Sequence, residues 1–250
     1  MHSHVRTQLP EDIFIVGYFD AKGLTSDFDI VGLPSSDLLV YLLRTLYYET
    51  ENNMYRFILA SQSPRRKELL ENIGAEFEVI VSDADESSVS GDGITPGLYV
   101  RELALIKAAA TAKKVLKDKK AVIIAADTIV TLDGKILGKP KDDNSAREML
   151  SSLSGRKHEV YTGYCVMRVK DGYTVCKSVK TDVYFKELTQ EKINAYIATG
   201  EPSDKAGAYG IQGIGGLLVE KIDGDYANVV GLPVSALADT LESEFDINIL

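Results

Sequence analysis

The segment at residues 59–70, LASQSPRRKELL, constrains the fold of this chain more than any other stretch. An apolar run ends abruptly at a serine-rich turn, and Pro64 then begins a helical pattern. Ser63 is suited to the N-cap and Pro64 to the first helical position, where the missing N–H of proline costs no hydrogen bond. Arg65 and Arg66 then belong to the first turn of a helix, beside unpaired backbone N–H groups that already favour an anion. Two cations there predict a phosphate-binding turn at the end of a strand; a surface helix with two solvated arginines is the alternative for this segment taken alone.

The charge balance limits the partners of the chain. Its 250 residues include 37 acidic and 28 basic side chains, for a formal net charge of -9. Such a protein has no long-range attraction for nucleic acid or for an anionic membrane. Any anion that it binds must be held by a local cluster of cations.

The same sequence argues for a cytoplasmic location. The polar first residues do not resemble a signal peptide, and the most apolar stretch, 38–46, is interrupted by Arg44. That stretch is far shorter than the roughly 20 residues that a membrane helix needs. Cys165 and Cys176 are too few for a disulfide scaffold, which indicates a reducing compartment. We therefore expect a cytoplasmic protein that binds neither membrane nor nucleic acid.

The order of expected elements divides the chain into two parts. Residues 1–55 form an N-terminal extension of unknown role, with a short strand near 13–16 and an apolar helix at 37–48. In residues 56–250, strands and helices alternate, and Asp-Gly dipeptides at 133–134 and 171–172 predict two hairpins. Hairpins combined with helical crossovers predict an α/β fold, a mixed sheet with helices packed on it. Strands are expected at 57–61, 77–81, 121–132, 135–137, 160–169, 173–185 and around 217–222, and helices at 64–74, 95–116, 144–153, 189–199 and from 233 onward.

Two charged residues lie where a charge needs an explanation. Asp127 follows the apolar strand pattern 122–126, where an ionised carboxylate is costly unless cations or a metal pair with it. Because Thr128 continues the strand, no helix begins there for Asp127 to cap. Lys139 lies between a glycine and a proline on a stiff turn, so it loses less entropy when it meets an anion. A loop-capping aspartate and a solvated lysine are the ordinary alternatives.

Three further residues are weak signals singly. Gln212 lies in the Gly-rich segment 204–213, and its amide can both donate and accept hydrogen bonds to a base. Lys107 lies in the expected helix 96–116, and Glu86 lies in the polar loop before that helix. The ordinary alternatives are a Gly-rich turn and solvent-facing charges.

Together these segments resemble the Maf family of nucleoside triphosphate pyrophosphatases. The family's acidic loop residue falls on Glu86 and its helical lysine on Lys107. The resemblance covers about residues 56–245. Its motifs follow in order: S-x-S-P-R-R-x-E-L-L at 61–70, A-D-T-[IV]-V at 126–130, G-K-P at 138–140, and M-L-x-x-L-S-G…H-x-V-x-T-G at 149–163.

The resemblance implies a fold and an activity. The fold is two-lobed, with a long twisted mixed sheet flanked by helices and a central cleft for the nucleotide. The reaction is hydrolysis between the α and β phosphates, which releases the monophosphate and pyrophosphate. The sequence YGIQG at 209–213 resembles the branch that acts on dTTP and UTP in nucleotide-pool house-cleaning. A homodimer is a further expectation from the family.

The resemblance also implies a role for each candidate residue. Asp127 is expected to be the general base, and Asp127 and Glu86 the ligands of a divalent metal, for which Mg²⁺ or Mn²⁺ suits oxygen donors. The residues expected to bind the substrate are Ser61, Arg65, Arg66, Lys107, Lys139, Thr128 and Gln212, of which Arg65, Thr128 and Gln212 occupy the positions that set base preference.

Two other functions remain open at this point. One is a nucleotide-sensing or cell-division regulatory protein that binds a triphosphate without hydrolysing it. The other is a hydrolase of deaminated purine or other modified nucleotides on a related fold. A pure binder has no need of a general base, and pyrophosphate release with and without magnesium distinguishes it from an enzyme.

Overall fold

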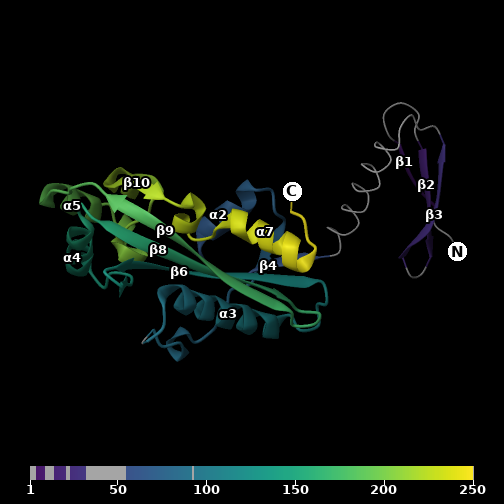
Figure 1. Cartoon of the computed structure of the whole chain (residues 1–250), viewed down its shortest axis with the longest axis horizontal. Helices are drawn as coiled ribbons and strands as arrows, with labels where there is room; N and C mark the ends of the chain where they lie inside the picture. The colour runs from purple at the N-terminus through teal and green to yellow at the C-terminus, as the bar shows by residue number, and fades with distance from the viewer. Residues whose placement is uncertain (1–3, 9–13, 21–22, 32–54, 92, 250) are drawn as a thin grey trace. The chain divides into compact units, whose positions relative to one another are not determined.

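The computed structural model describes residues 4–8, 14–20, 23–31, 55–91 and 93–249. The chain divides into two compact units, Met1–Asn53 and Met54–Leu250. The first unit contains an antiparallel sheet in the order β1-β2-β3, formed by β1 (His4–Gln8), β2 (Phe14–Asp20) and β3 (Gly23–Val31) (Figure 1). The strand expected near 13–16 corresponds to β2, whereas the sequence pattern predicts neither β1 nor β3. The helix expected at 37–48 lies outside the described residues.

The second unit is built on a seven-stranded mixed sheet, as the sequence predicts. Its order is β10-β9-β8-β6-β4-β5, and β7 pairs with β6. Strand β4 runs parallel to β5 and β6, and the other neighbours are antiparallel. The strands are β4 (Arg56–Leu59), β5 (Phe77–Val79), β6 (Ala121–Leu132), β7 (Lys135–Leu137), β8 (Lys157–Arg168), β9 (Thr174–Phe185) and β10 (Val219–Asp223).

The helices of this unit begin and end close to their sequence signals. The hydroxyl of Thr95 caps the long helix α3, and Asp142 and Ser145 form a capping box at α4. The sequence pattern predicts neither α6 nor the short 3₁₀ helices, which are too brief to show a periodicity. The helices are α2 (Pro64–Asn72), α3 (Pro96–Lys114), α4 (Asp143–Leu153), α5 (Gln190–Ile197), α6 (Tyr226–Val230) and α7 (Val234–Phe245), and the 3₁₀ helices are η1 (Glu86–Ser88), η2 (Glu201–Asp204), η3 (Ala206–Ala208) and η4 (Gly213–Leu218).

Helices cover both faces of the sheet, with α3 on one face and α2 and α7 on the other (Figure 1). Successive residues of a strand point to opposite faces. In β6, Ile123 and Ala125 belong to the apolar cluster beneath α3, and Ile124 and Ala126 belong to the cluster beneath α2 and α7. Strand β6 is therefore buried on both faces, which explains its continuous apolar sequence.

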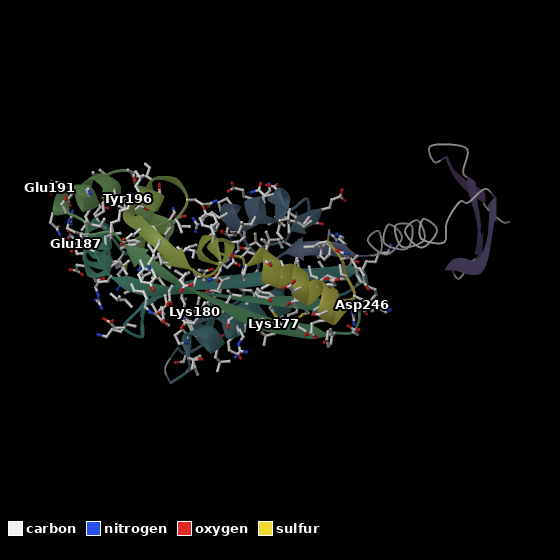
Figure 2. The ribbon with its side chains drawn as sticks, turned by 45° about the horizontal axis from the view of Figure 1, so that its top comes forward. Lys177, Lys180, Glu187, Glu191, Tyr196 and Asp246 are labelled. Carbon is white, nitrogen blue, oxygen red and sulfur yellow. A yellow bond between two sulfur atoms is a disulfide. The ribbon has the colours of Figure 1, made fainter. Side chains whose placement is uncertain are left out.

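A third apolar cluster forms a second lobe of this unit. Residues of α4, α5 and β10 pack there against the far ends of β6, β8 and β9. In Figure 2, Glu187, Glu191 and Tyr196 mark this lobe, and Asp246 marks the other end of the unit. The two-lobed α/β arrangement expected from the sequence is thus present.

The two cysteines occupy opposed positions on neighbouring strands. Cys165 of β8 lies directly across from Cys176 of β9, with 4.1 Å between their Cα atoms, and a disulfide joins them. A single disulfide is not a disulfide scaffold, as the sequence predicts. Because the two cysteines are joined, however, their low number does not by itself indicate a reducing compartment. Among the described residues, no helix is both long enough and apolar enough to span a bilayer.

Candidate active site

A cavity of about 600 Å³ lies where the sheet has a gap beside β6. Strand β4 pairs with residues 121–124 of β6, and β7 pairs with residues 130–132. Between these stretches, β6 pairs with β8 alone among the described strands. The missing neighbour leaves room beside Asp127 and Thr128, both of which line the cavity.

Strand alternation assigns these two residues to different partners. Asp127 continues the series of Ile123 and Ala125 and faces α3, whereas Thr128 continues the alternate series and faces α2. Adjacent residues of one strand thereby reach helices on opposite sides of the sheet.

On the α3 side, Lys107 lies between two carboxylates. Its Nζ atom is 2.5 Å from Oδ1 of Asp127 and 3.0 Å from Oε1 of Glu86. The side chains of Lys107 and Asp127 are only 13% and 16% exposed, while that of Glu86 is 54% exposed. The structure thus brings together the acidic loop residue, the helical lysine and the strand aspartate that the sequence singles out. A charge pair so shielded from solvent interacts more strongly than a surface pair.

On the α2 side, Arg66 joins three parts of the chain. Its guanidinium donates to Oγ of Ser61 (3.1 Å), to Oγ1 of Thr128 (3.0 Å) and to the carbonyl oxygen of Gly231 (2.7 Å). Burial is the main cause that lowers its pKa from the ordinary arginine value, and the carboxylate of Asp127 opposes that effect. Three acceptors of the protein already hold Arg66, so it orders the wall of the cavity whether or not a phosphate is present.

Ser61 and Arg65 remain available to a ligand. The Oγ atom of Ser61 accepts from Arg66 and from the backbone N–H of Ser63, which leaves its own proton free to donate. Arg65 lies 3.9 Å from Oδ2 of Asp204, across the cavity on the other lobe. At that distance the ion pair is loose, and an anion entering the cavity can compete for Arg65. Ser63 is the N-cap residue of α2, as the sequence predicts, but its side chain makes no capping hydrogen bond.

Lys139 and Gln212 line the same cavity from different sides. Lys139 is exposed and forms no ion pair within the described part of the chain. Gln212 immediately precedes η4, and its Nε2 atom lies 3.5 Å from Oε2 of Glu68 on α2. All nine candidate residues therefore lie around one cavity: Ser61, Arg65, Arg66, Glu86, Lys107, Asp127, Thr128, Lys139 and Gln212.

Some residues at the cavity have no role in the sequence argument. Lys205 lines the cavity, and its Nζ atom is 2.7 Å from both Oδ1 of Asp204 and the carbonyl oxygen of Glu201. Gly231 supplies a carbonyl oxygen to Arg66 from the segment between α6 and α7. Lys205 belongs to the Gly-rich segment that carries Gln212, so the sequence could have indicated Lys205 as a further cation of the site. The sequence could not have indicated Gly231, because its contact with Arg66 uses a backbone carbonyl 165 residues away.

This geometry defines a class of protein: an α/β protein with a cleft between two lobes. Cationic side chains and two carboxylates line the cleft, as suits a ligand with several negative charges. The model of the family described as Maf-like protein matches residues 56–244. The chain belongs to the Maf family.

Curated relatives are similar over nearly their whole length. A dTTP/UTP pyrophosphatase of Alkaliphilus metalliredigens is 53% identical over 197 residues, which are 79% of this chain and 100% of that protein. A dTTP/UTP pyrophosphatase of Bacillus cytotoxicus is 51% identical over 77% of this chain and 97% of its own. One of Clostridioides difficile is 49% identical over 77% and 96%. The family resemblance read from the sequence motifs is confirmed.

Proposed function

We propose that this protein hydrolyses dTTP and UTP to the monophosphate and pyrophosphate. The observation that carries the proposal is the contact of Lys107 with both Asp127 and Glu86, inside a cavity lined by Arg65 and Lys139. A triphosphate is strongly anionic, and fixed cations stabilise charge that develops on its phosphoryl groups. The relatives that match this chain are named dTTP/UTP pyrophosphatases.

The candidate residues that line the cavity have distinct tasks in this reaction. Asp127 accepts the proton of the attacking water, and Lys107 holds its carboxylate in place. Arg65 and Lys139 bind the phosphates, Arg65 through its planar fork and Lys139 as a point charge. The hydroxyl group of Ser61 donates a hydrogen bond to a phosphate oxygen. Arg66 orients the side chains of Ser61 and Thr128 by donating a hydrogen bond to each hydroxyl oxygen.

Two carboxylates also make the site suitable for a divalent cation. Mg²⁺ is usually held by one or two carboxylates together with phosphate oxygens of the substrate. Asp127 and Glu86 fit that pattern, and within the described residues there is no cluster of three or more His, Cys, Asp or Glu side chains that would hold a metal unaided. When bound, Mg²⁺ or Mn²⁺ supplies a Lewis acid that neutralises phosphate charge.

The test is pyrophosphate release from UTP, dTTP, CTP and GTP, with and without added Mg²⁺. We expect release that depends on the metal and is fastest with UTP and dTTP. Binding of the triphosphates without release would show a nucleotide-sensing protein instead. Preference for a deaminated purine triphosphate in the same assay would indicate the other hydrolase.

Base preference is expected to depend on Gln212. Its amide offers a donor and an acceptor to the edge of uracil or thymine, and a site built for one edge leaves polar groups unpaired against another. Replacing Gln212 with Glu removes the donor and adds a charge. We expect kcat/KM for UTP and dTTP to fall far more than that for GTP. Equal losses for all four nucleotides would show that Gln212 supports the loop without reading the base.

A further inference from the structure

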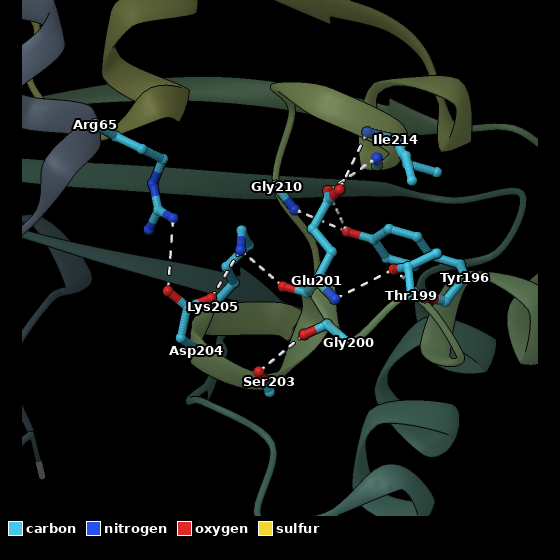
Figure 3. A network of polar contacts seen from close by, with 11 residues as sticks. Arg65, Tyr196, Thr199, Gly200, Glu201, Ser203, Asp204, Lys205, Gly210 and Ile214 are labelled. Atoms are coloured by element: carbon cyan, nitrogen blue, oxygen red, sulfur yellow. Dashed lines mark hydrogen bonds and ion pairs between the residues drawn. The ribbon is translucent and has the colours of Figure 1, made fainter.

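The carboxylate of Glu201 holds the loop that carries Gln212. Glu201 begins η2, and its side chain accepts hydrogen bonds from the hydroxyl of Tyr196 (2.9 Å) and from the backbone N–H groups of Ile214 (3.1 Å) and Gly215 (3.0 Å). Figure 3 shows these donors converging on the Glu201 carboxylate. Among the described residues, no cation pairs with that carboxylate, so the three donors provide its stabilisation.

The opposite end of the same loop is also held. The backbone N–H of Gly210 donates to the hydroxyl oxygen of Tyr196 at 3.3 Å. Tyr196 therefore accepts from Gly210 and donates to Glu201, while Glu201 accepts from residues 214 and 215 (Figure 3). Both ends of the segment 210–215 are attached to one pair of side chains, with Gln212 between them.

The loop is folded too tightly to be positioned by its own side chains. A Cβ atom on Gly215 would lie 2.2 Å from the carbonyl oxygen of Gly210 and 2.6 Å from the Tyr196 hydroxyl. Gly213 has a φ of +66°, and a Cβ there would lie 3.1 Å from Oε2 of Glu201. Glycine allows this close approach of backbone to backbone and of backbone to carboxylate, but it supplies no packing of its own.

The side chain of Gln212 has little else to fix it. It makes no capping hydrogen bond to η4, and its contact with Glu68 is 3.5 Å long. The position of the Gln212 amide therefore depends on the backbone of the loop, and that backbone depends on Glu201 and Tyr196.

We propose that Glu201 is a positioning residue for base recognition: it fixes the 210–215 loop and through it the amide of Gln212. This inference rests on the proposed function, which assigns base reading to Gln212. Neither Glu201 nor Tyr196 lines the cavity, so both act through the loop without touching the nucleotide. Arg65, Lys107 and Lys139 belong to other elements, and among the described residues none of them forms a hydrogen bond or ion pair with Glu201 or with the 210–215 loop; the one link to η2 is the loose 3.9 Å pair of Arg65 with Asp204. We therefore expect phosphate binding to depend little on this loop.

The test replaces Glu201 with Gln in the full-length protein. The variant keeps the size of the side chain but turns one acceptor oxygen into an NH₂ group that faces a donor. We expect kcat/KM for UTP and dTTP to fall roughly tenfold to 100-fold, the range for lost hydrogen bonds to a charged group, mainly through KM. The ratio of kcat/KM for UTP to that for GTP should fall, while the inhibition constant of inorganic tripolyphosphate should stay within about twofold. The matched control is Glu187→Gln, an exposed glutamate of the same lobe outside the cavity, which should behave as the wild type.

A second measurement does not depend on the nucleotide. Hydrogen exchange of the Ile214 and Gly215 amides should be faster in Glu201→Gln than in the wild type. Unchanged exchange, or an unchanged UTP-to-GTP ratio, would overturn the inference. A wild-type enzyme with no pyrimidine preference would instead overturn the base assignment in the proposed function. If Glu201→Gln does not fold, Tyr196→Phe is the replacement: it removes the Gly210 and Glu201 contacts together, and it must lower the UTP-to-GTP ratio for the inference to stand.

Discussion

At the scale of single residues, the chemistry of the cleft centres on the contact between Lys107 and Asp127. The two side chains come from different elements, α3 and β6, and are mostly shielded from solvent. Removing Lys107 takes from Asp127 its ion-pair partner, and removing Asp127 leaves Lys107 paired with the more exposed Glu86 alone. Changes at this pair therefore affect both turnover and the local structure, and the test must separate the two.

Asp127→Asn tests the carboxylate of Asp127 both as the proton acceptor and as a metal ligand. Asparagine has nearly the same shape and still accepts a hydrogen bond from Lys107, so we expect the fold to be retained. Without a basic carboxylate, kcat should fall by roughly 10²-fold or more, as for a positioned general base. The measurement is kcat for UTP in a variant that is shown to be folded by circular dichroism. Asp223→Asn, at the exposed end of β10, is the control and should leave kcat unchanged. Full turnover by folded, metal-loaded Asp127→Asn would exclude Asp127 from the mechanism.

His158 gives the protein a stability that depends on pH. It is 1% exposed, its Nε2 atom lies 2.7 Å from the hydroxyl of Tyr209, and burial lowers its pKa to about 4. Its ordinary value is near 6.5, so between pH 6.5 and pH 4 the unfolded chain binds a proton that the folded chain does not. Stability is therefore lost as the pH falls through this window, and above it His158 contributes no pH dependence.

We expect this residue to cost about 2 kcal/mol of stability between pH 7.5 and pH 5. The measurement is urea unfolding at the two pH values in the wild type and in His158→Gln, which does not titrate. The wild type should lose more stability than the variant over the same interval. Equal losses in both proteins would show that other groups carry the acid sensitivity.

At the scale of elements, the site depends on how closely α3 approaches β8. Gly163 of β8 lies opposite Asp127 in the ladder with β6. A Cβ atom on Gly163 would lie 2.3 Å from the carbonyl carbon and oxygen of Val100 in α3. These are backbone atoms that cannot move locally, so glycine is required for the helix to pack at this distance. Because α3 also carries Lys107, the same contact sets the distance between Lys107 and Asp127.

Gly163→Ala should therefore displace α3 as a unit. We expect a loss of unfolding free energy on the order of 1–3 kcal/mol, as for other overpacked cores, together with reduced kcat. Gly91→Ala serves as the control, because its Cβ would meet ordinary contacts of 3.7–3.8 Å. Chemical denaturation and kcat for UTP measure both effects. Wild-type stability of Gly163→Ala would mean that α3 does not require this close approach.

At the scale of the whole molecule, the described residues of the candidate site belong to the second unit. Every residue that lines the cavity lies within Met54–Leu250, and the family match begins at residue 56. The first unit contains the three-stranded sheet of β1, β2 and β3.

A truncated protein that begins at Met54 should keep the kcat of the full chain. The measurement is pyrophosphate release from UTP by both proteins, after thermal unfolding has shown that the truncated form is folded. Its solubility or stability is expected to decrease, because the sequence predicts that the apolar segment 37–48 covers an apolar surface, which the truncation would expose. A soluble, folded and inactive truncated protein would mean that the first unit contributes to catalysis.

Local sequence signals were enough to predict most of the second unit. The Asp-Gly turns, the proline and threonine at helix starts and the apolar run of β6 act over a few residues, so they can be read without knowing the fold. The motifs likewise identified the family, because the residues of each motif are close neighbours in the chain. In the first unit, β1 and β3 lack such signals.

Only the tertiary structure decided how these residues work together. The gap between β4 and β7 creates the cavity, and strand alternation then directs Asp127 toward α3 and Thr128 toward α2. Arg66, which the sequence predicts as a phosphate-binding cation, also donates to acceptors 5, 62 and 165 residues away. In the sequence Glu201 is an ordinary acidic residue, but in the structure its carboxylate accepts a hydrogen bond from the backbone of a loop 13 residues later. Such contacts join residues that are far apart in the chain, and the residue types alone do not indicate them. The packing of the folded chain therefore decides which of these side chains meet.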